Sequence, residues 1–347
     1  MEDCYSFADF WKKNLEKTGR YIAQEILLNV EPLQKKWAEE NGIKYSEENW
    51  LIEILNAQIS IFRPNVIFSH DLQYITPEVR LDLKKQNPSI QLIFGWDGIT
   101  AHNPKKFTGC DMMLSCVKET SEFYSQNGFI GYFFPFGFEK KILDKITPHR
   151  ELYDVSFVGS LVLRNNFHAN RLKFLSEISK IGKLKTWITN FPSIRHPFAK
   201  IWIWRARTMP VSQYLDAFRV ATINNPAVYG IKMYQTLADS KITLNIHATK
   251  HAGNMRLLEA TGVGTCLLTD DCENIRDYFE PDKEIVTYKD ISDAIEKIKY
   301  LLKNEEKRKE IALAGQKRAL EEYSLENRIN TFAKFMEQYL NSNEKNY

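Results

Sequence analysis

Short runs of apolar, β-branched and aromatic residues alternate with longer amphipathic stretches along this chain, and this alternation restricts the folds open to it. Two of the longer stretches predict helices: 47–62, with apolar residues three and four apart, and 76–87, where Thr76 and Pro77 fit the N-cap and first turn. Strands that alternate with helices predict a parallel sheet with crossover helices. The expected strands of the first half are EILLN (25–29), NVIFSH (65–70), QLIFGW (91–96), MMLSC (112–116) and GYFFPFG (131–137).

The alternation starts again after residue 150. The charged segment 138–150 ends in a proline turn and is the expected linker. From residue 291 onward the pattern is helical, with Ser324 as an N-cap of the last helix. We therefore expect an α/β fold with Rossmann-like domains over 1–145 and 146–323, and a C-terminal helix over 324–347 that packs back toward the first domain. The expected strands of the second half are DVSFVG (154–159), KTWIT (185–189), ITLNIH (242–247), TCLLTD (265–270) and EIVTY (284–288).

Composition excludes several classes of protein. The length of 347 residues favours two domains, and 44% hydrophobic residues can fill two ordinary cores. A net charge of +3 gives no strong field, so nucleic acid is not an expected partner. Five cysteines without a C-x-x-C pair or a zinc spacing argue against a disulfide framework and favour the cytoplasm. No apolar run reaches the ~20 residues that span a bilayer, and the N-terminus does not resemble a signal peptide, although peripheral membrane contact stays open.

Polar residues at the expected strand ends are the first candidates for a site, because open α/β sheets bind ligands at the carboxyl ends of their strands. A helix starting near Asn254 would direct backbone N–H groups at a phosphate, and Arg256 could add a charge-assisted contact. Glu259 could accept hydrogen bonds from two ribose hydroxyls. These groups together fit a nucleoside diphosphate. The strand-end candidates of the second domain are Gly159, Ser160, Asn245, His247, Asp270 and Asp271.

Each of these candidates also has an ordinary structural explanation. Glu259 could lie on a solvated helix face, paired with Arg256 three residues earlier. His247 could be a hydrogen-bonded structural histidine, and Asp270 or Asp271 is expected as an N-cap of the next helix rather than half of a metal pair. The two glycines of TGVGT lack the full G-x-G-x-x-G pattern, which disfavours a dinucleotide-dependent dehydrogenase. The aromatic and basic segment 191–210 fits packing against the domain better than an interfacial anchor.

Residues 254–288, NMRLLEATGVGTCLLTDDCENIRDYFEPDKEIVTY, resemble the donor-binding region of nucleotide-sugar glycosyltransferases of the two-domain GT-B type. The resemblance is strongest to the group called spore maturation protein CgeB-like, which is related to family 4 glycosyltransferases. It continues through the closing helices, while PNVIFSHDLQYITPE and PFGFE resemble a strand and the closing turn of the first domain of those enzymes. It implies two Rossmann-like domains that face a cleft and bind a nucleotide sugar.

The resemblance also implies roles for individual residues. Glu259 would bind the donor ribose, and Gly159 and Ser160 would border the phosphates, with Arg164 as a further phosphate charge. His251 stands where family 4 enzymes commonly have a second Glu, and Ser160 where they often have Arg. The relatives begin with a strand and a glycine loop before their first helix, whereas here about ten polar residues precede the helix FADFWKKNLEKTG, so the N-terminal domain is expected to lack its first strand. The residues that would face the diphosphate and the donor sugar are His251, Gly253, Asn254, Met255 and Arg256.

The expected function is that of a hexosyltransferase-like glycosyltransferase, which moves a sugar from a nucleotide diphosphate to an unknown acceptor. No D-x-D motif stands at a strand end, so we expect transfer without a metal or cofactor, and the resemblance implies retention of anomeric configuration. The catalytic candidates are Asp97, His102 and Arg256. The expected acceptor side comprises Asp97 and His102 together with His70 and Asp71. These four residues also fit a structural explanation, as parts of turns and helix caps. The alternatives are a nucleotide-sugar-binding protein without activity and an interaction module.

Overall fold

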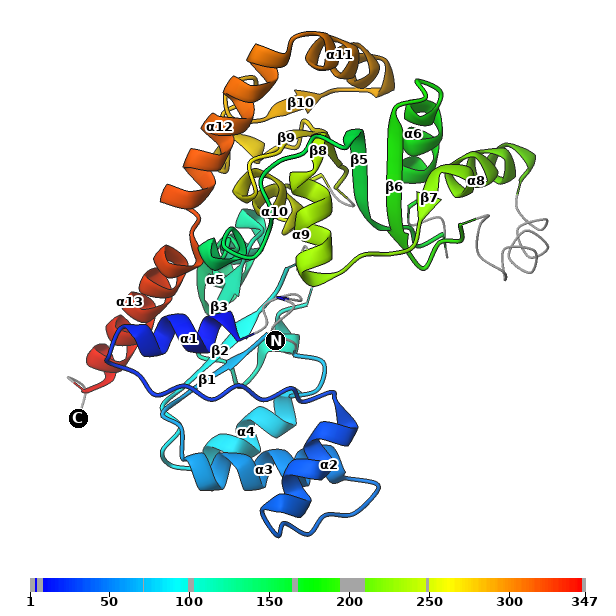
Figure 1. The fold of residues 1–347 in the computed structure, drawn as a ribbon. Helices are drawn as coiled ribbons and strands as arrows, with labels where there is room; N and C mark the ends of the chain where they lie inside the picture. The colour runs from blue at the N-terminus through cyan, green and yellow to red at the C-terminus, as the bar shows by residue number, and fades with distance from the viewer. Residues whose placement is uncertain are drawn as a thin grey trace. The chain divides into compact units, whose positions relative to one another are not determined.

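The structure of the chain is a computed structural model, and it describes residue 4 and residues 9–70, 72–98, 103–163, 168–193, 210–247 and 250–344. It divides into two compact units, each with its own parallel sheet (Figure 1). One unit comprises Trp11–Pro135 and Arg328–Tyr347, and the other comprises Met1–Phe10 and Phe136–Asn327. The domain boundaries expected at 145/146 and 323/324 stay predictions.

The Trp11–Pro135 unit has a four-stranded parallel sheet in the order β1-β2-β3-β4, with all four strands at expected places. Within the described residues no strand precedes β1, in keeping with the expected lack of a first strand. The strands are β1 (Val66–Ser69), β2 (Leu92–Trp96), β3 (Met112–Ser115) and β4 (Ile130–Phe133). The helices are α1 (Phe10–Lys17), α2 (Glu31–Glu40), α3 (Trp50–Phe62), α4 (Pro77–Gln86) and α5 (Lys118–Gln126), with a 3₁₀ turn, η1 (Pro104–Phe107).

The prediction of a strand at EILLN (25–29) was wrong. Residues 25–27 have no regular structure and residues 28 and 29 form a turn. Ile26 and Leu28 instead pack, partly buried, against the core that α3, α4 and α5 form with the sheet. The apolar run therefore covers the core without pairing to a strand, which an apolar pattern alone does not distinguish from a strand.

The beginning of α4 follows from its sequence. Thr76 accepts a hydrogen bond from the backbone N–H of Val79, and Pro77 occupies the first turn, as expected. Arg80 on this helix is fully buried and donates to the carbonyls of Ile75, Lys106 and Thr108. It thereby ties α4 to η1.

The last helix, α13 (Leu325–Glu344), covers the four-stranded sheet with the part that follows Arg328. The Phe332 ring lies with its centroid 4.7 Å from that of Phe94 and 5.1 Å from that of Phe68, and Phe335 stacks on Tyr132 at 3.9 Å. Ser324 accepts a hydrogen bond from the N–H of Asn327 at 3.4 Å, which is the expected N-cap contact.

The other unit has a six-stranded parallel sheet in the order β10-β9-β8-β5-β6-β7. β5 pairs with β6 on one side and β8 on the other, so the strand order reverses there, as at the ligand-binding edge of open α/β sheets. The five strands expected in the second half are present, and β7 was not expected because it has only two residues. The strands are β5 (Tyr153–Ser160), β6 (Leu184–Thr189), β7 (Asn224–Asn225), β8 (Ser240–Asn245), β9 (Cys266–Asp270) and β10 (Val286–Tyr288).

Two groups of helices pack on this sheet. One comprises α6 (Ala169–Ser179), α8 (Val211–Ile223) and α11 (Ile291–Lys303). The other comprises α9 (Gly230–Ala238), α10 (Arg256–Gly262) and α12 (Glu305–Glu321). The described part of this unit also contains two short 3₁₀ turns, η2 (Lys140–Ile142) and η4 (Ile275–Asp277). The core runs along the central strands, for example at Val155, Leu244 and Leu268.

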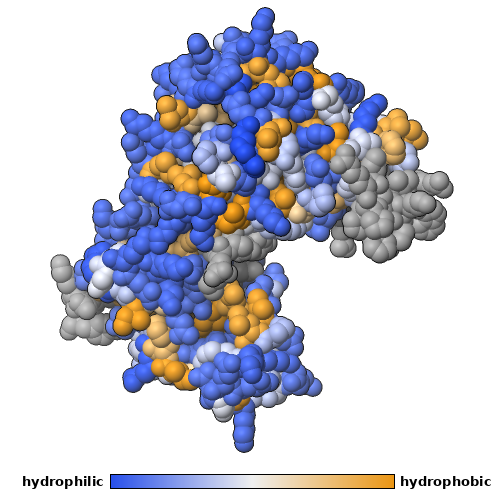
Figure 2. Space-filling view, in the orientation of Figure 1, coloured by the Kyte–Doolittle hydropathy of each residue, from blue (hydrophilic) through white to orange (hydrophobic). Residues whose placement is uncertain are grey.

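The face of the molecule seen in Figure 2 is largely hydrophilic, with scattered hydrophobic areas. One lies on α8, where Val211, Leu215 and Phe218 expose 77%, 48% and 42% of their surface. Of the segment 191–210, only 191–193 and residue 210 are described, and Phe191 packs into the core, so the expectation for the rest lies outside the described residues. Among the helices described, none has both the length and the apolar character needed to cross a bilayer.

Candidate functional site

Glu259 is buried in the middle of α10. The helix follows β8 through the loop that ends at Met255, and all of its residues from Leu257 to Gly262 are buried. Glu259 exposes only 8% of its surface. The alternative that placed it on a solvated helix face was therefore wrong.

Arg256 pairs with Glu259 one helical turn away. Its Nη1 lies 2.9 Å from Glu259 Oε2, and both side chains are largely buried. This contact is an ion pair without hydrogen-bond geometry. The buried Nε and Nη1 atoms of Arg256 therefore have no hydrogen-bond partner among the described residues. Nη2 faces only the Sδ atom of Met233, at 3.5 Å. Since buried N–H groups are normally satisfied, this guanidinium keeps donors available for an anion.

A small cavity of ≈ 10 Å³ lies beside Glu259. This volume holds about one water molecule, so the cavity reaches the carboxylate but is not a nucleotide pocket. Tyr234 lies at its edge, and burial, together with the charge of Glu259, raises the pKa of its phenol. The lining residues include Phe138, Glu139, Tyr234, Met255, Leu258 and Glu259.

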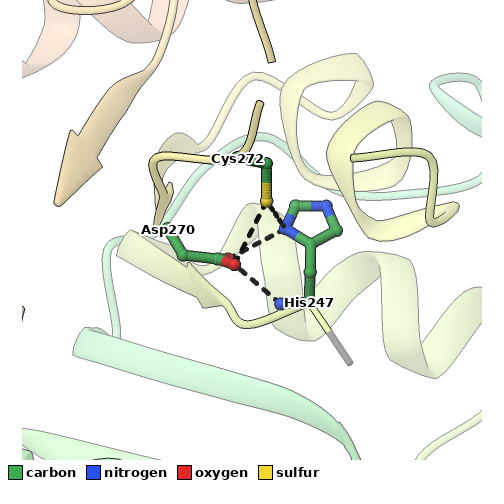
Figure 3. A group of neighbouring side chains, drawn as sticks. All are labelled: His247, Asp270 and Cys272. Carbon is green, nitrogen blue, oxygen red and sulfur yellow. Dashed lines mark hydrogen bonds and ion pairs between the residues drawn. The ribbon is translucent and has the colours of Figure 1, made fainter. Parts of the chain in front are cut away.

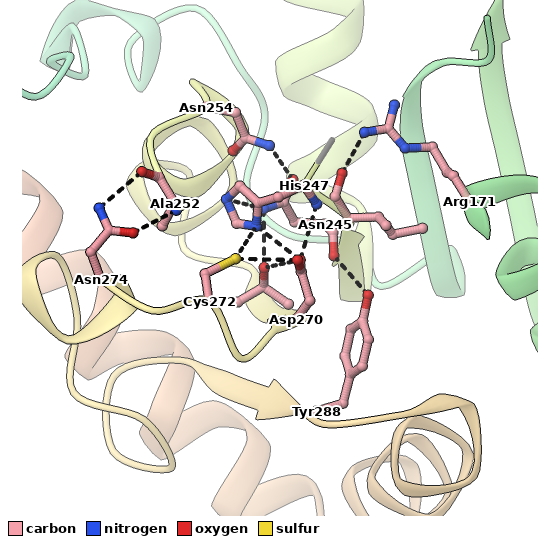
Figure 4. Close-up of polar contacts among 11 residues, drawn as sticks. Arg171, Asn245, His247, Ala252, Asn254, Asp270, Cys272, Asn274 and Tyr288 are labelled. Carbon is pink, nitrogen blue, oxygen red and sulfur yellow. Dashed lines mark hydrogen bonds and ion pairs between the residues drawn. The ribbon is translucent and has the colours of Figure 1, made fainter. Parts of the chain in front are cut away.

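The loop that leads into α10 is held at several points (Figure 4). Gly253 has a φ of +153°, a conformation that favours glycine. Ala252 and the Asn274 side chain exchange two hydrogen bonds, of 2.7 and 3.1 Å. Asn254 Nδ2 donates to Asn245 Oδ1 at 2.8 Å, while His251 is half-buried. α10 has only seven residues and no side-chain cap at Met255, so a phosphate near this loop would depend on Arg256 more than on the helix dipole.

Asn245 ends β8, His247 lies two residues beyond it, and both belong to a hydrogen-bonded network (Figure 3, Figure 4). The His247 side chain is 2% exposed, and its Nδ1 lies 2.8 Å from Asp270 Oδ1 and 3.1 Å from Cys272 Sγ. Asn245 Nδ2 approaches His247 Nε2 at 3.3 Å. This geometry agrees with a hydrogen-bonded structural histidine, and it leaves little of either side chain for a donor sugar.

The prediction that Asp270 or Asp271 is the N-cap of the next helix was wrong. The next helical turn is η4, and its N-cap position is Asn274, without a side-chain cap. Asp270 instead accepts from the backbone N–H of His247 at 3.0 Å, and Asp271 pairs with Arg276. Burial opposes ionisation of Asp270, but the hydrogen bonds from His247 outweigh it and hold its pKa below the usual value. Burial and the charge of Asp270 raise the pKa of the Cys272 thiol.

Gly159 and Ser160 end β5, as expected, and a residue that sequence reasoning missed joins them to β8. Arg171 on α6 donates from Nη1 to the Ser160 carbonyl at 2.9 Å and from Nη2 to the Ile246 carbonyl at 2.5 Å. A Cβ on Gly159 would come within 2.9 Å of the Phe157 ring. Burial lowers the pKa of Arg171. No motif marks this arginine in the sequence, and Arg164 lies outside the described residues.

The candidates of the Trp11–Pro135 unit lie in packed surroundings. His70 follows β1 and stacks on Trp96, with a centroid distance of 5.4 Å. Asp97 follows β2, is 5% exposed and accepts a hydrogen bond from the Tyr124 hydroxyl. Burial first, and then this contact, raise the pKa of Tyr124. Asp71 and His102 lie outside the described residues.

Comparison with known proteins gives one sequence family and many similar structures. Residues 200–334 match a family described as glycosyl transferase-like. A search of curated protein sequences finds no significant match to the chain.

Solved structures resemble this chain over most of its length. HepE from Anabaena, in complex with UDP and glucose, has a TM-score of 0.63 at 9% identity, covering 96% of each chain. Sucrose-phosphate synthase from Thermosynechococcus elongatus has a TM-score of 0.58 at 10% identity, covering 86% of this chain and 81% of that one. A UDP-N-acetylglucosamine 2-epimerase described as putative, from Listeria monocytogenes, has a TM-score of 0.55 at 13% identity, covering 96% and 92%. The two parallel-sheet units therefore have the GT-B fold of glycosyltransferases, and residues 200–334 match a glycosyl transferase-like family.

Proposed function

We propose that this protein is a glycosyltransferase that moves a sugar from a nucleotide-diphosphate donor to an acceptor. The observation that carries the proposal is the buried pair of Arg256 and Glu259, within the stretch that matches the glycosyl transferase-like family. Two ionised groups are costly to bury, and donors left unsatisfied on Arg256 add to that cost. A ligand that supplies an anion and hydroxyl groups offsets it.

Each side chain of the pair has a role in this proposal. Glu259 accepts hydrogen bonds from the two ribose hydroxyls of the donor. Arg256 donates to the diphosphate, and the loop around Gly253 lets the backbone approach it, with His251, Asn254 and Met255 nearby. Gly159, Ser160 and Arg164 border the phosphates from the end of β5. The CgeB-like group remains our proposed subfamily.

The chemistry needs stabilisation of charge on the leaving diphosphate. A positioned guanidinium supplies it in a site with little water, where such contacts are strong. We propose retention of anomeric configuration, with no protein nucleophile and no metal on the diphosphate. Asp97 and His102 act on the acceptor side, with His70 and Asp71 beside them. The acceptor itself is a glycan, a protein or a small molecule, and we place the reaction in the cytoplasm.

A second candidate is a nucleotide-sugar protein that does not transfer the sugar. One observation favours it: His251 stands where related enzymes commonly have a second Glu. A similar fold also occurs in the Listeria protein described as a putative epimerase, so fold alone does not select transfer. Such a protein would bind nucleotide at Glu259 without turnover.

The first test is nucleotide binding. Isothermal calorimetry and thermal melts with UDP, GDP, ADP and CMP should show one preferred nucleotide, and at ~100 times its dissociation constant that nucleotide should add ~2.7 kcal/mol of stability. Glu259→Gln should lose most of the affinity. Glu296→Gln, the same change at an exposed position on α11, should keep it. Failure of all four nucleotides to bind would leave an interaction module as the better description.

The second test separates the reactions. NMR of the matching nucleotide sugar follows glycoside formation, donor hydrolysis and epimerisation in one experiment. Binding without any of the three would favour the second candidate. Turnover that EDTA abolishes and Mn²⁺ restores would contradict a diphosphate site without metal.

A further inference from the structure

Three side chains that the proposed reaction does not use meet at the ends of β8 and β9. His247 Nδ1 lies 2.8 Å from Asp270 Oδ1 and 3.1 Å from Cys272 Sγ, and Sγ lies 3.2 Å from Asp270 Oδ2 (Figure 3). His247 is 2% exposed at its side chain, and Cys272 is 5% exposed. The Asp270 side chain is 27% exposed and forms the open side of the cluster.

The geometry does not fit a nucleophilic triad. In a Cys-His-Asp triad the thiol and the carboxylate contact opposite nitrogens of the imidazole, so that the ring can relay a proton. Here both Sγ and Oδ1 approach Nδ1, while Nε2 faces the Asn245 amide. Three donor atoms that converge on one side are instead the arrangement of a chelate.

The backbone holds these three residues in place. Asn245 pairs with Thr269 in the β8–β9 ladder, which puts His247, two residues after β8, close to Asp270, the last residue of β9. The His247 N–H donates to Asp270 Oδ1 at 3.0 Å, and the Cys272 N–H donates to the Asp270 carbonyl at 3.0 Å. Positions fixed by the sheet and a hydrogen-bonded turn lower the entropy lost when an ion binds.

Two asparagine side chains lie behind the histidine. Asn245 contacts His247 Nε2 and also accepts from Asn254 Nδ2, while the buried Asn254 Oδ1 has no hydrogen-bond partner among the described residues (Figure 4). Exchanging the oxygen and nitrogen of both amides reverses the direction of the Asn254–Asn245 hydrogen bond and turns Asn245 Oδ1 toward Nε2. In that arrangement Asn245 Oδ1 accepts a hydrogen bond from the Nε2–H of His247 and leaves Nδ1 free as a ligand, which is how hydrogen-bonding neighbours orient metal-binding histidines.

We propose that His247, Asp270 and Cys272 form a Zn²⁺ site, with a fourth position open to water on the Asp270 side. Imidazole, thiolate and carboxylate together suit Zn²⁺, whereas Mg²⁺ and Ca²⁺ prefer oxygen ligands alone. Zinc bonds of about 2.0–2.3 Å put tetrahedral ligands roughly 3.3–3.6 Å apart. The three donors need to spread by only a few tenths of an ångström to reach this spacing.

The binding step balances in protons. The Cys272 thiol releases its proton to solvent as the Zn–S bond forms. The imidazole proton moves from Nδ1 to Nε2, and Nε2–H then donates a hydrogen bond to Asn245 Oδ1. Asp270 remains a carboxylate. One proton is therefore released for each ion bound, and no oxidant or reductant is needed.

The site would fasten the loop that leads to Arg256. His247 precedes that loop, and Asn274, two residues after Cys272, holds it by two hydrogen bonds to Ala252. An ion bound to both sides would join the start of the loop to the segment that clamps it. This is a positioning role, separate from contact with the diphosphate.

Metal binding by the full-length protein tests the site directly. The protein, stripped with a chelator, is titrated with Zn²⁺ in competition with a chromophoric indicator, and with Co²⁺ under visible and near-ultraviolet spectroscopy. The expected result is one equivalent bound, with tetrahedral ligand-field bands and a thiolate-to-cobalt charge-transfer band. Zn²⁺ should also raise the midpoint of thermal unfolding, while Mg²⁺ should not.

Two variants and a control keep the test decisive. Cys272→Ala should abolish the charge-transfer band, and Asp270→Asn should weaken Zn²⁺ binding at least tenfold. Cys116→Ala, which removes a buried thiol in the other unit, should change neither. Circular dichroism confirms that each variant is folded, and if one is not, Cys272→Ser replaces Cys272→Ala. The proposal is overturned if the wild-type protein binds no Zn²⁺ at micromolar concentrations, or if the cobalt spectrum of the folded Cys272 variant equals that of the wild type.

Discussion

Arg256 and Glu259 form an ion pair 2.9 Å long across one turn of α10, in a part of the helix where the neighbouring side chains are buried hydrophobic residues. An exposed pair at this spacing contributes ~0.2–0.5 kcal/mol. Burial changes the energetics, because removing one member leaves the other charge in surroundings that cannot solvate it.

Glu259→Gln should therefore lower the free energy of unfolding by ~1–3 kcal/mol, since Arg256 would lose its counter-charge. Replacing both residues, as Arg256→Met with Glu259→Gln, should recover much of that loss. Urea unfolding of the two single variants and the double variant gives the coupling energy. Additive effects would show that the pair is not coupled and would remove the energetic argument for a ligand at this position.

The sequence predicted the α/β alternation well because each buried strand is a compact apolar run. Nine of the ten strands found among the described residues coincide with expected ones. β7 could not be found, since Asn224 and Asn225 carry no strand pattern and pair through the backbone with Thr186 and Trp187. The run at 25–29 has the apolar pattern of a strand, so a strand was predicted there. Its side chains pack against the core, but its backbone does not pair with a strand.

The site was predictable only in part. Glu259 stood out as a carboxylate among apolar neighbours, and its burial agrees with that. The cluster of His247, Asp270 and Cys272 depends on the register that pairs Asn245 with Thr269, which local spacing does not contain. Arg171 reaches the strand ends from α6, 75 residues before its acceptor at Ile246, and no motif marks it.

Gly262→Ala should destabilise the protein by ~1–3 kcal/mol through overpacking. A Cβ at this position would lie 2.4 Å from Cγ of the Phe138 ring, which closes over the end of α10. Thermal and urea unfolding measure the loss. Combining the change with Phe138→Leu should restore part of it, because the smaller side chain removes the clash. If the double variant is no more stable than Gly262→Ala alone, the ring is not the cause.

Asp97→Asn separates chemistry from packing in the Trp11–Pro135 unit. Asparagine keeps an acceptor for the Tyr124 hydroxyl and removes the charge, so the proposed acceptor-side role predicts a fall in kcat of roughly 10²-fold at unchanged thermal stability. Steady-state kinetics with the donor identified by calorimetry measure kcat, and a thermal melt measures the stability of the variant. Full turnover in both Asp97→Asn and His102→Ala would place the acceptor side elsewhere. Full turnover with a lower melting temperature would assign Asp97 to the core.

His168 should make stability fall in mild acid. It exposes 6% of its surface, and its Nδ1 accepts a hydrogen bond from the Val162 N–H at 2.9 Å, which requires an unprotonated nitrogen. Burial, and then the charge of Arg171, lower its pKa from 6.5 to about 4. Above 6.5 the ring is neutral in the folded and unfolded chains, so its contribution is complete. As the pH falls toward about 4, His168 becomes protonated in the unfolded chain but stays largely neutral in the folded chain. The free energy of unfolding therefore drops by about 1–3 kcal/mol.

Urea unfolding at a series of pH values across this interval measures the effect. His168→Gln keeps an acceptor for Val162 and cannot titrate, so it should flatten the slope between pH 6.5 and about 4. If the His168 variant retains the wild-type slope, the acid sensitivity belongs to the buried carboxylates and not to the contact between His168 and Val162.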